Sequence, residues 1–355
     1  MFIMKLNDVY KPNNHYKVII KTITYNHSKY IQDTLNGVAI QETNFPFVNI
    51  VLEDHSTDGE QDIIRLWLER ECNMSLSEHY DIPTADIIIA PHKSNKNCTF
   101  AVYFHKENLF HQKGKREAQL YPWRIKSEYE ALCEGDDYWI DSLKLQKQVD
   151  FLDRNVAYSC CHTAFNCVDF KGDIIKREDY EKKNLISGNG ERFWFTMLVE
   201  NYILTCTFMM RSKFSLTLPI GYHDYGIFLH NARQGYVGFL PERMSCYRQT
   251  PGSIMNDSQK LLWLNDAFKR ITVKEILNIL EYAEGTIEEV YNYPKKKRAI
   301  ARLLIMCINS NDSGLRESIR RIYLRRPMYL FLGVFYKLIK KNPCDFYVDL
   351  GSSLK

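Results

Sequence analysis

Short apolar runs alternate with amphipathic segments along the first ninety residues of the chain. Residues 17–26 (KVIIKTITYN) form a β-branched run that predicts a buried strand, and the segment 28–38 then repeats apolar side chains at helical spacing. A second apolar run at 48–52 and a second helical pattern at 56–68 repeat this unit, and a third run follows at 85–90. This alternation predicts an α/β fold in which a mostly parallel, Rossmann-like sheet is flanked by helices.

The pattern changes in the second half of the chain. Residues 131–133 predict a short strand that leads into the sequence EGDDYW at 134–139, and residues 143–152 predict a helix. The remaining periodicity predicts three features, namely a hairpin over 158–175 that turns at Lys171-Gly172-Asp173, a strand over 203–210, and mostly helical structure over 258–340.

The composition is that of an ordinary globular protein. The chain has 355 residues, 45% of them hydrophobic and 25% charged, which excludes collagen-like, coiled-coil and disordered classes and allows about two domains. It has no uncharged apolar run of roughly 18 residues and no basic start before a long apolar stretch, so we expect neither a spanning helix nor a signal peptide. Ten cysteines without a CxxC motif predict reduced thiols, a cytosolic protein and no structural zinc.

Positive charge is concentrated near the end of the chain. The formal net charge is +4, but residues 294–343 hold thirteen Lys and Arg against two acids, so that segment carries +11 and the remainder −7. Within it, PMYLFLGVFYKLIKK (327–341) is apolar and then basic, which suits an anionic membrane surface. The alternative is a helical domain docked on the body with its basic side chains solvated. No RNA- or DNA-binding motif accompanies the charge, so we expect no nucleic-acid partner.

Acidic side chains follow the predicted strands at the points where those strands end. Glu53 and Asp54 follow the second strand, and the short later strand runs into Glu134, Asp136 and Asp137. Because the carboxyl ends of parallel strands meet at one edge of a sheet, these acids are expected to lie close together. Carboxylates crowded in this way repel one another unless a cation compensates, and hard oxygen ligands favour Mg²⁺ or Mn²⁺. The alternative is a solvated acidic turn.

The segment DHSTDG (54–59) imitates the start of a calcium-binding EF-hand loop. Position twelve of such a loop should be Glu and is Arg65 here, so an EF-hand is excluded. Ser56 and Asp58 are instead expected to cap the following helix. Asp54 lies at the strand tip, where its carboxylate could accept an N–H from a nucleotide base.

Three segments together resemble a known family. VIIKTITYNHSKYIQDTLNGV, then IVLEDHSTDG, then CEGDDYW are similar in order and spacing to the catalytic domain of family-2 glycosyltransferases, which have the GT-A fold. The usual versions are P-T-Y-N, D-D-x-S-x-D and the metal motif D-x-D-D, and the match covers about residues 16–250. Departures occur at Ile23, which replaces the proline, and at Glu53 and Glu134, which replace aspartates.

The resemblance implies roles for individual residues. Asp54 would accept the imide N–H of the base, most often uracil, and Arg248 would contact the diphosphate, with a solvated strand end as its alternative. Inverting members use one late carboxylate as general base, for which Asp224 is the best match and a helix cap the alternative. The other implied sites are the nucleotide pocket, lined by Thr24, Tyr25 and Asn26, and the site for ribose and Mn²⁺ or Mg²⁺, formed by Glu134, Asp136 and Asp137.

These features together predict a glycosyltransferase. We expect a catalytic domain over 1–255, with a nucleotide-binding half at 16–150 and an acceptor half at 151–255, and a helical basic region at 256–355. The donor would be a nucleotide sugar, with UDP-sugars favoured, and the acceptor a glycan or lipid-linked glycan in polysaccharide biosynthesis. The protein would be cytoplasmic or peripheral on the inner face of the cell membrane. The alternatives are a non-catalytic partner in a glycan-assembly complex and a metal-dependent sugar nucleotidyltransferase.

Overall fold

A computed structural model describes residues 10–183, 203–218, 224–251 and 313–325, together with residues 327 and 330. The chain divides into two compact units. One comprises Met1–Phe193 and Tyr202–Pro251, and the other comprises Trp194–Asn201 and Gly252–Lys355. The expected domain boundary near residue 255 stays a prediction.

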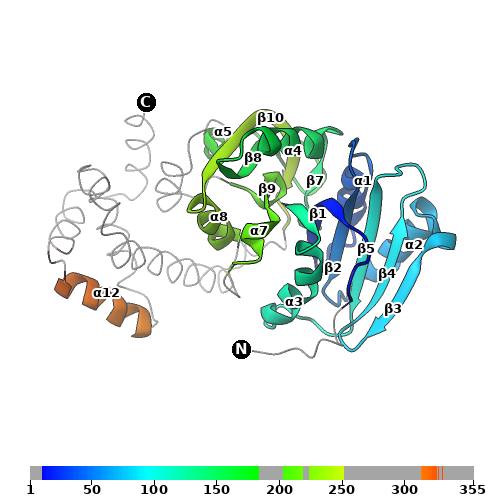
Figure 1. Ribbon diagram of the computed structural model, residues 1–355, viewed down its shortest axis with the longest axis horizontal. Helices are drawn as coiled ribbons and strands as arrows, with labels where there is room; N and C mark the ends of the chain where they lie inside the picture. The colour runs from blue at the N-terminus through cyan, green and yellow to red at the C-terminus, as the bar shows by residue number, and fades with distance from the viewer. Residues whose placement is uncertain are drawn as a thin grey trace. The chain divides into compact units, whose positions relative to one another are not determined.

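Within the described part of the first unit, ten strands form a single mixed sheet (Figure 1). Its spatial order is β3-β4-β5-β2-β1-β6-β9-β8-β10-β7. The strands are β1 (Tyr16–Thr24), β2 (Phe47–Glu53), β3 (Glu78–Ile82), β4 (Ala85–Pro91), β5 (Cys98–His105), β6 (Ser127–Leu132), β7 (Tyr138–Trp139), β8 (Tyr158–Val168), β9 (Phe208–Arg211) and β10 (Tyr236–Arg248).

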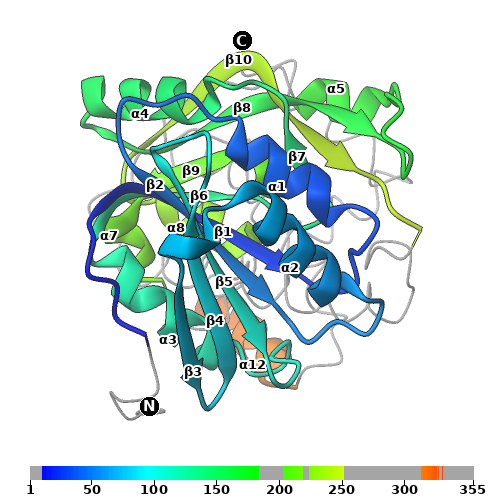
Figure 2. The same ribbon diagram turned by 90° about the vertical axis from the view of Figure 1, so that its right-hand side faces the viewer.

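The helices cover the sheet and connect its strands. Figure 2 shows α1 and α2 lying beside each other over the sheet. Among the described residues of this unit, the helical elements are α1 (Ile31–Ala39), α2 (Glu60–Glu71), η2 (Met74–Leu76), α3 (Lys113–Arg124), α4 (Lys144–Arg154), α5 (Glu178–Lys183), η3 (Thr205–Thr207), α7 (Ser212–Ser215) and α8 (Asp224–Ala232).

Both faces of the central strands are apolar because helices cover both of them. In β1, Val18 and Ile20 belong to the core cluster that includes residues of α1, α2 and α4. Ile19 points to the other face, where its cluster includes Leu120 and Trp123 of α3. Alternate residues of a strand point to opposite faces, so a continuous apolar run is what a doubly covered strand requires. The predicted α/β fold with a helix-flanked sheet is confirmed.

The parallel part of the sheet positions the candidate site. β1 pairs in parallel with both β2 and β6, and β2 pairs in parallel with β5. The carboxyl ends of these four strands therefore lie at one edge, and the loops that follow them meet there. α1 and α2 begin just after the first two of these ends, at Ile31 and Glu60.

One expectation about strand pairing was wrong. The run at 85–90 is β4, which pairs antiparallel with both β3 and β5, whereas the parallel strand next to β2 is β5. A two-residue turn joins β3 to β4 and leaves no room for a crossover helix. The expected hairpin over 158–175 is present in a short form: β8 is followed by a turn that includes Gly172, with a φ of +95°, and an antiparallel bridge joins Val168 to Ile174.

The described part of the second unit contains the helix α12 (Ser313–Arg325). Ile319 and Tyr323, one turn apart, are buried, whereas Arg316, Arg320 and Arg321 are exposed. The rest of the segment 258–340 that we expected to be helical lies outside the described residues. No helix among the described residues is both long enough and apolar enough to cross a membrane.

Lys144 gives the fold a pH dependence that can be measured. Its side chain is fully buried, donates to Gln148 Oε1 at 2.6 Å and lies 4.1 Å from the centre of the Trp139 ring. Burial lowers the pKa of this lysine from 10.5 to about 8. Between pH 8 and pH 10.5 the unfolded state therefore binds more protons than the folded state, and the contribution of Lys144 to stability rises with pH.

We expect the difference in free energy of unfolding between wild type and Lys144→Met to change by about 2 kcal/mol in favour of wild type from pH 7 to pH 10. Methionine has a similar volume but no titrating group, so thiol and tyrosine titrations common to both proteins cancel. Urea unfolding at a series of pH values measures this difference. Parallel stability curves for the two proteins would show that Lys144 keeps its ordinary pKa.

Candidate active site

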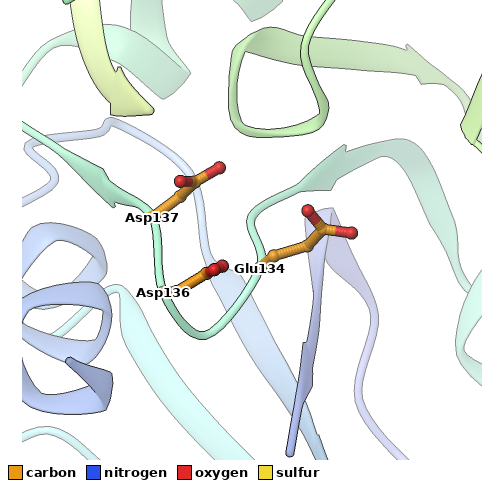
Figure 3. A group of neighbouring side chains, drawn as sticks. All are labelled: Glu134, Asp136 and Asp137. Carbon is orange, nitrogen blue, oxygen red and sulfur yellow. The ribbon is translucent and has the colours of Figure 1, made fainter. Parts of the chain in front are cut away.

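Three carboxylates converge in the loop between β6 and β7 (Figure 3). Glu134, Asp136 and Asp137 each offer one oxygen, and these three oxygens all lie within 4.8 Å of one another. Asp137 is buried, and the other two residues are partly exposed. The structure thus brings together the three acids that were predicted from EGDD.

The backbone of this loop is held by α1 and β1. The Thr34 hydroxyl of α1 donates to the carbonyl oxygens of Gly135 and Asp137, at 3.0 and 2.6 Å. The Gly135 N–H donates to the carbonyl oxygen of Ile23 at 3.0 Å. Because Thr34 is fully buried, these bonds are shielded from water and fix the loop against the helix.

Crowding and burial set the charge properties of the loop. Burial raises the pKa of Asp137 well above its usual range, as does the Asp136 carboxylate, while the Arg248 N–H and the Cys206 thiol oppose the rise. Burial likewise raises the pKa of Glu134, followed by the charges of Asp224, Asp136 and Asp137. The Lys21 ammonium acts in the opposite direction on Glu134. Both shifts express the cost of holding several negative charges together with little water.

The residues of this loop fit a divalent cation. One oxygen of Asp137, Oδ1, accepts a hydrogen bond from the backbone N–H of Arg248 at 2.8 Å. The other, Oδ2, is buried and accepts no hydrogen bond from a nitrogen or oxygen donor among the described residues. A buried carboxylate oxygen without a nitrogen or oxygen donor, beside two further carboxylates, is the environment that a hard cation stabilises. The expected Mn²⁺ or Mg²⁺ is compatible with these ligands, and the identity of the metal stays a prediction.

Arg248 ends β10 and braces the acidic loop from the other side. Its Nε donates to the carbonyl oxygen of Asp136 at 2.9 Å, and its Nη2 donates to Asp33 Oδ2 of α1 at 2.6 Å. The guanidinium lies 4.9 and 5.0 Å from the ring centres of Tyr30 and Tyr138, and the residue is 4% exposed. The sequence predicted Arg248 as a residue of the site, but it did not predict that Arg248 bonds these groups of the protein.

Thr24, the last residue of β1, and the two residues that follow it differ in their surroundings. Thr24 is buried, and its hydroxyl donates to Glu60 Oε1, so its side chain belongs to the packing beneath the edge. Tyr25 is 42% exposed, and Asn26 is exposed with a positive φ of 57°. Asn26 Oδ1 accepts the Thr57 N–H at 2.8 Å, which joins this loop to the loop after β2. Tyr25 and Asn26 thus lie at the surface of the strand-end edge.

Asp54 is buried at the tip of β2 and organises the loop after β5. Its Oδ1 accepts the Leu109 N–H at 2.7 Å and lies 3.3 Å from His105 Nδ1. Its Oδ2 lies 3.8 Å from Arg116 Nη1. The carboxylate is therefore at the predicted strand tip, but it faces protein groups from the segment that follows β5.

Asp224 is the exposed first residue of α8 and belongs to the same unit as the acidic loop. Its charge is the second largest influence on the pKa of Glu134, after burial. The structure therefore brings this late carboxylate into the electrostatic neighbourhood of the triad.

Several residues of this edge were not found from the sequence. His27 Nε2 lies 3.8 Å from Asp136 Oδ2, Arg116 faces Asp54, and the buried Glu60 bonds the loop after β1. Thr34 gave the clearest available signal, because it is a polar residue on the apolar face of α1. Glu60 resembles the acid often found in the first turn of a helix, so only its burial distinguishes it.

Ser56 and Asp58 were both expected to cap α2. The N-cap residue is Gly59, and of the two expected residues only Asp58 accepts an N–H of the helix. Asp58 Oδ1 accepts the Glu60 N–H at 3.2 Å. Ser56 instead accepts the Asn26 N–H at 2.9 Å and donates to Glu60 Oε2 at 2.8 Å. The seryl hydroxyl therefore joins two loops rather than satisfying a free N–H of the helix.

Known proteins resemble the chain at different levels. No protein-family model matches it. Uncharacterized proteins of Mycobacterium tuberculosis (strain H37Rv) and Mycobacterium bovis are 29% identical to it over 236 residues, which are 65% of this chain and 58% of each relative. The chain thus spans little more than half the length of these curated relatives.

Solved structures resemble the fold. The crystal structure of S. aureus TarS 1-349 has a TM-score of 0.50 at 16% identity, over 83% of this chain and 72% of that one. The chain has a glycosyltransferase fold. TarS 1-349 with UDP-GlcNAc, at 14% identity, covers 91% of this chain and 92% of its own, with a TM-score of 0.47. Mannosyltransferase PcManGT of Pyrobaculum calidifontis with GDP-Man and Mn²⁺, at 13% identity, covers 95% and 92%, with a TM-score of 0.43. These two lower scores add nothing to the assignment of the fold.

The close approach of Gly135 to Thr24 provides a test of the acidic loop. A Cβ at position 135 would lie 2.0 Å from Thr24 Oγ1 and 2.5 Å from Thr24 Cβ, far inside contact distance. We expect Gly135→Ala to displace the loop and to weaken Mn²⁺ binding, measured by calorimetry, roughly tenfold or more. The matched control is Gly235→Ala, whose Cβ would lie 2.6 Å from the Ala157 carbonyl oxygen at the opposite end of β10. The control should lose stability but keep its Mn²⁺ affinity, and unchanged affinity in Gly135→Ala would contradict the proposed ligand set.

Proposed function

We propose that this chain transfers a sugar, with inversion, from a nucleotide-sugar donor to a glycan or lipid-linked glycan acceptor in polysaccharide biosynthesis. The observation that carries the proposal is the convergence of Glu134, Asp136 and Asp137 at the strand-end edge of a glycosyltransferase fold. Ligands of open α/β sheets bind at such edges, where loops from several strands meet. A UDP-sugar is the favoured donor on the family resemblance of the loop motifs.

The donor would lie along the loops after β1, β2 and β6. Tyr25, with its exposed ring, would stack near the base, and Asn26 would line the same pocket with the Thr24 backbone. Asp54 would contact the base directly by accepting its imide N–H, or would position the loop at Leu109 against the base. Asp136 would contact the ribose.

Glu134, Asp136 and Asp137 would hold Mn²⁺ or Mg²⁺. The cation, when bound, supplies positive charge that stabilises the leaving nucleoside diphosphate. Arg248, which the resemblance implies for the diphosphate, is buried and bonded to Asp33, so it would act on the diphosphate through its positive charge.

Asp224 would act on the acceptor side. Attack on the anomeric carbon requires an acceptor hydroxyl to lose its proton, and an exposed carboxylate near the triad can accept it. A single displacement would then form the new glycosidic bond as the bond to the diphosphate breaks, which inverts the anomeric centre. The proton remains on Asp224 until it exchanges with solvent.

Two alternatives are separable from this proposal. A sugar nucleotidyltransferase would require a Gly-rich basic phosphate loop after β1. The sequence there is TYNHSKY, which contains no glycine, and its Asn26 is joined by hydrogen bonds to the loop after β2. A non-catalytic partner in a glycan-assembly complex would not require nucleotide binding. The basic segment 294–343 is the part that would contact an anionic membrane carrying a lipid-linked acceptor, and that contact stays a prediction.

Donor binding is the first test. We expect wild type to bind UDP by calorimetry only when Mn²⁺ is present, and Asp136→Ala to lose this binding because it lacks a metal ligand. Asp150→Ala, which removes a partly exposed acid from α4, is the matched control and should bind as wild type does. If wild type bound neither UDP, GDP nor CMP in a metal-dependent way, the transferase proposal would fail in favour of the non-catalytic partner.

The role of Asp224 is tested by turnover at constant donor affinity. We expect Asp224→Asn to lower the release of UDP from UDP-GlcNAc or UDP-glucose by about 10²–10⁴-fold, while the UDP affinity stays unchanged. Asparagine keeps the shape and can still cap the helix, so a pure capping role predicts wild-type turnover. Unchanged turnover would assign Asp224 to the start of α8 and leave the base elsewhere.

A further inference from the structure

Glu60 is a fully buried carboxylate at the start of α2, and the mechanism does not use it. Gly59, with a φ of +85°, precedes it and makes the left-handed turn that starts the helix. An acid in the first turn of a helix is normally solvated, since its interaction with the helix dipole does not need burial. Complete burial of this acid therefore requires another explanation.

Its two oxygens are occupied by neighbours from two loops. Oε1 accepts the Thr24 hydroxyl, and Oε2 accepts the His27 N–H at 2.9 Å and the Ser56 hydroxyl at 2.8 Å. Burial raises the pKa of Glu60, and these three hydrogen bonds oppose the rise. The carboxylate thus joins the loop after β1 to the loop after β2.

Further bonds cross between the same two loops. The Asn26 N–H donates to Ser56 Oγ, and the Ser28 N–H donates to Asp58 Oδ2, both at 2.9 Å. The two loops contain the non-glycine residues with positive φ in the described chain, Asn26 at 57° and His55 at 63°. Residues in this region of backbone space need surrounding contacts to stay there. Glu60 is a buried residue among those that supply these contacts between the two loops.

The effect of Glu60 extends to the acidic loop. Thr24, which it holds, lies so close to Gly135 that no side chain fits between them. His27, whose N–H it accepts, places its Nε2 3.8 Å from Asp136 Oδ2. Movement of either residue would therefore move the backbone that carries Asp136.

We propose that Glu60 is a positioning residue for the donor site, which fixes Tyr25 and Asn26 on one side and the acidic loop on the other. This inference rests on the proposed transferase function, because it assigns the fixed loops to a nucleotide sugar. It also makes a structural claim that does not need a nucleotide, namely that the loops after β1 and β6 move together when Glu60 is lost.

Two substitutions at position 60 separate positioning from charge. Glu60→Gln keeps an oxygen for the His27 N–H and the Ser56 hydroxyl, and its amide can donate to Thr24 Oγ1. Glu60→Ala removes the acceptor of all three hydrogen bonds. We expect Glu60→Ala to weaken Mn²⁺-dependent UDP binding roughly tenfold or more, and Glu60→Gln to stay within about threefold of wild type.

A buried acid whose side-chain hydrogen bonds, among the described residues, do not reach the loops after β1 and β2 controls for lost stability. Glu130 of β6 is also fully buried, and it accepts two hydrogen bonds from Arg124 at 2.7 and 2.9 Å. We expect Glu130→Gln to lower the melting temperature without lowering UDP affinity. If Glu130→Gln reduced UDP affinity in the same proportion to its stability as Glu60→Ala does, Glu60 would have only a general structural role.

Hydrogen exchange provides a readout that does not depend on nucleotide. In Glu60→Ala, backbone amides at 24–28 and 133–137 should exchange at least about tenfold faster, while those of β5 should not change. Unchanged exchange at 133–137 would overturn the proposed coupling, even if Glu60→Ala were too unstable for calorimetry. Failure of wild type to bind any nucleotide would remove the donor-site role and the proposed function together, whereas equal binding by wild type and Glu60→Ala would remove the positioning role alone.

Discussion

Repulsion among three carboxylates in one short loop is the constraint on which the candidate site depends. Glu134, Asp136 and Asp137 approach within 4.8 Å of one another through their oxygens, and burial increases the cost of keeping them charged. The loop is held by bonds to its backbone, from Thr34 to two carbonyl oxygens, and by the backbone N–H of Arg248 to one oxygen of Asp137. Its shape is therefore fixed without neutralising its charge, which is the preorganisation that a cation site needs.

The positively charged side chains near the acidic loop also leave the charge of its three carboxylates largely unpaired. The Arg248 guanidinium bonds Asp33 and the Asp136 carbonyl oxygen rather than a carboxylate of the triad. Lys21 acts on Glu134, but it acts on Glu117 and Glu130 as well. An arginine or lysine placed directly among the three carboxylates would have compensated their charge at the expense of a metal. Among the described residues, no arginine or lysine forms an ion pair with a carboxylate of the triad, and the basic group that lies beside the Asp136 carboxylate is the His27 ring.

The sequence predicted the local features of the site better than its long-range connections. Strand ends and acidic motifs are local, so β1, β2, the acidic loop and the positions of Asp54 and Asp224 could be predicted from short segments. The direction of β4 relative to its neighbours could not be predicted, because an apolar run has the same pattern whether those neighbours are parallel or antiparallel. Nor could the burial of Thr24 and Glu60, since Thr and Glu at a loop and a helix start are equally common on surfaces. Their role becomes visible only when two loops that are 36 residues apart are placed in contact.

The Arg248 N–H that bonds Asp137 comes from 111 residues further along the chain. A contact of this sequence separation forms late, because the loop that it closes must first lose its conformational freedom. During synthesis the acidic loop therefore emerges with its carboxylates but without the strand that completes it. Until β10 has been added beside β8, this amide cannot reach the acidic loop. The order of the chain thus makes the complete acidic loop, with both its acids and its Arg248 hydrogen bond, a property of the finished domain.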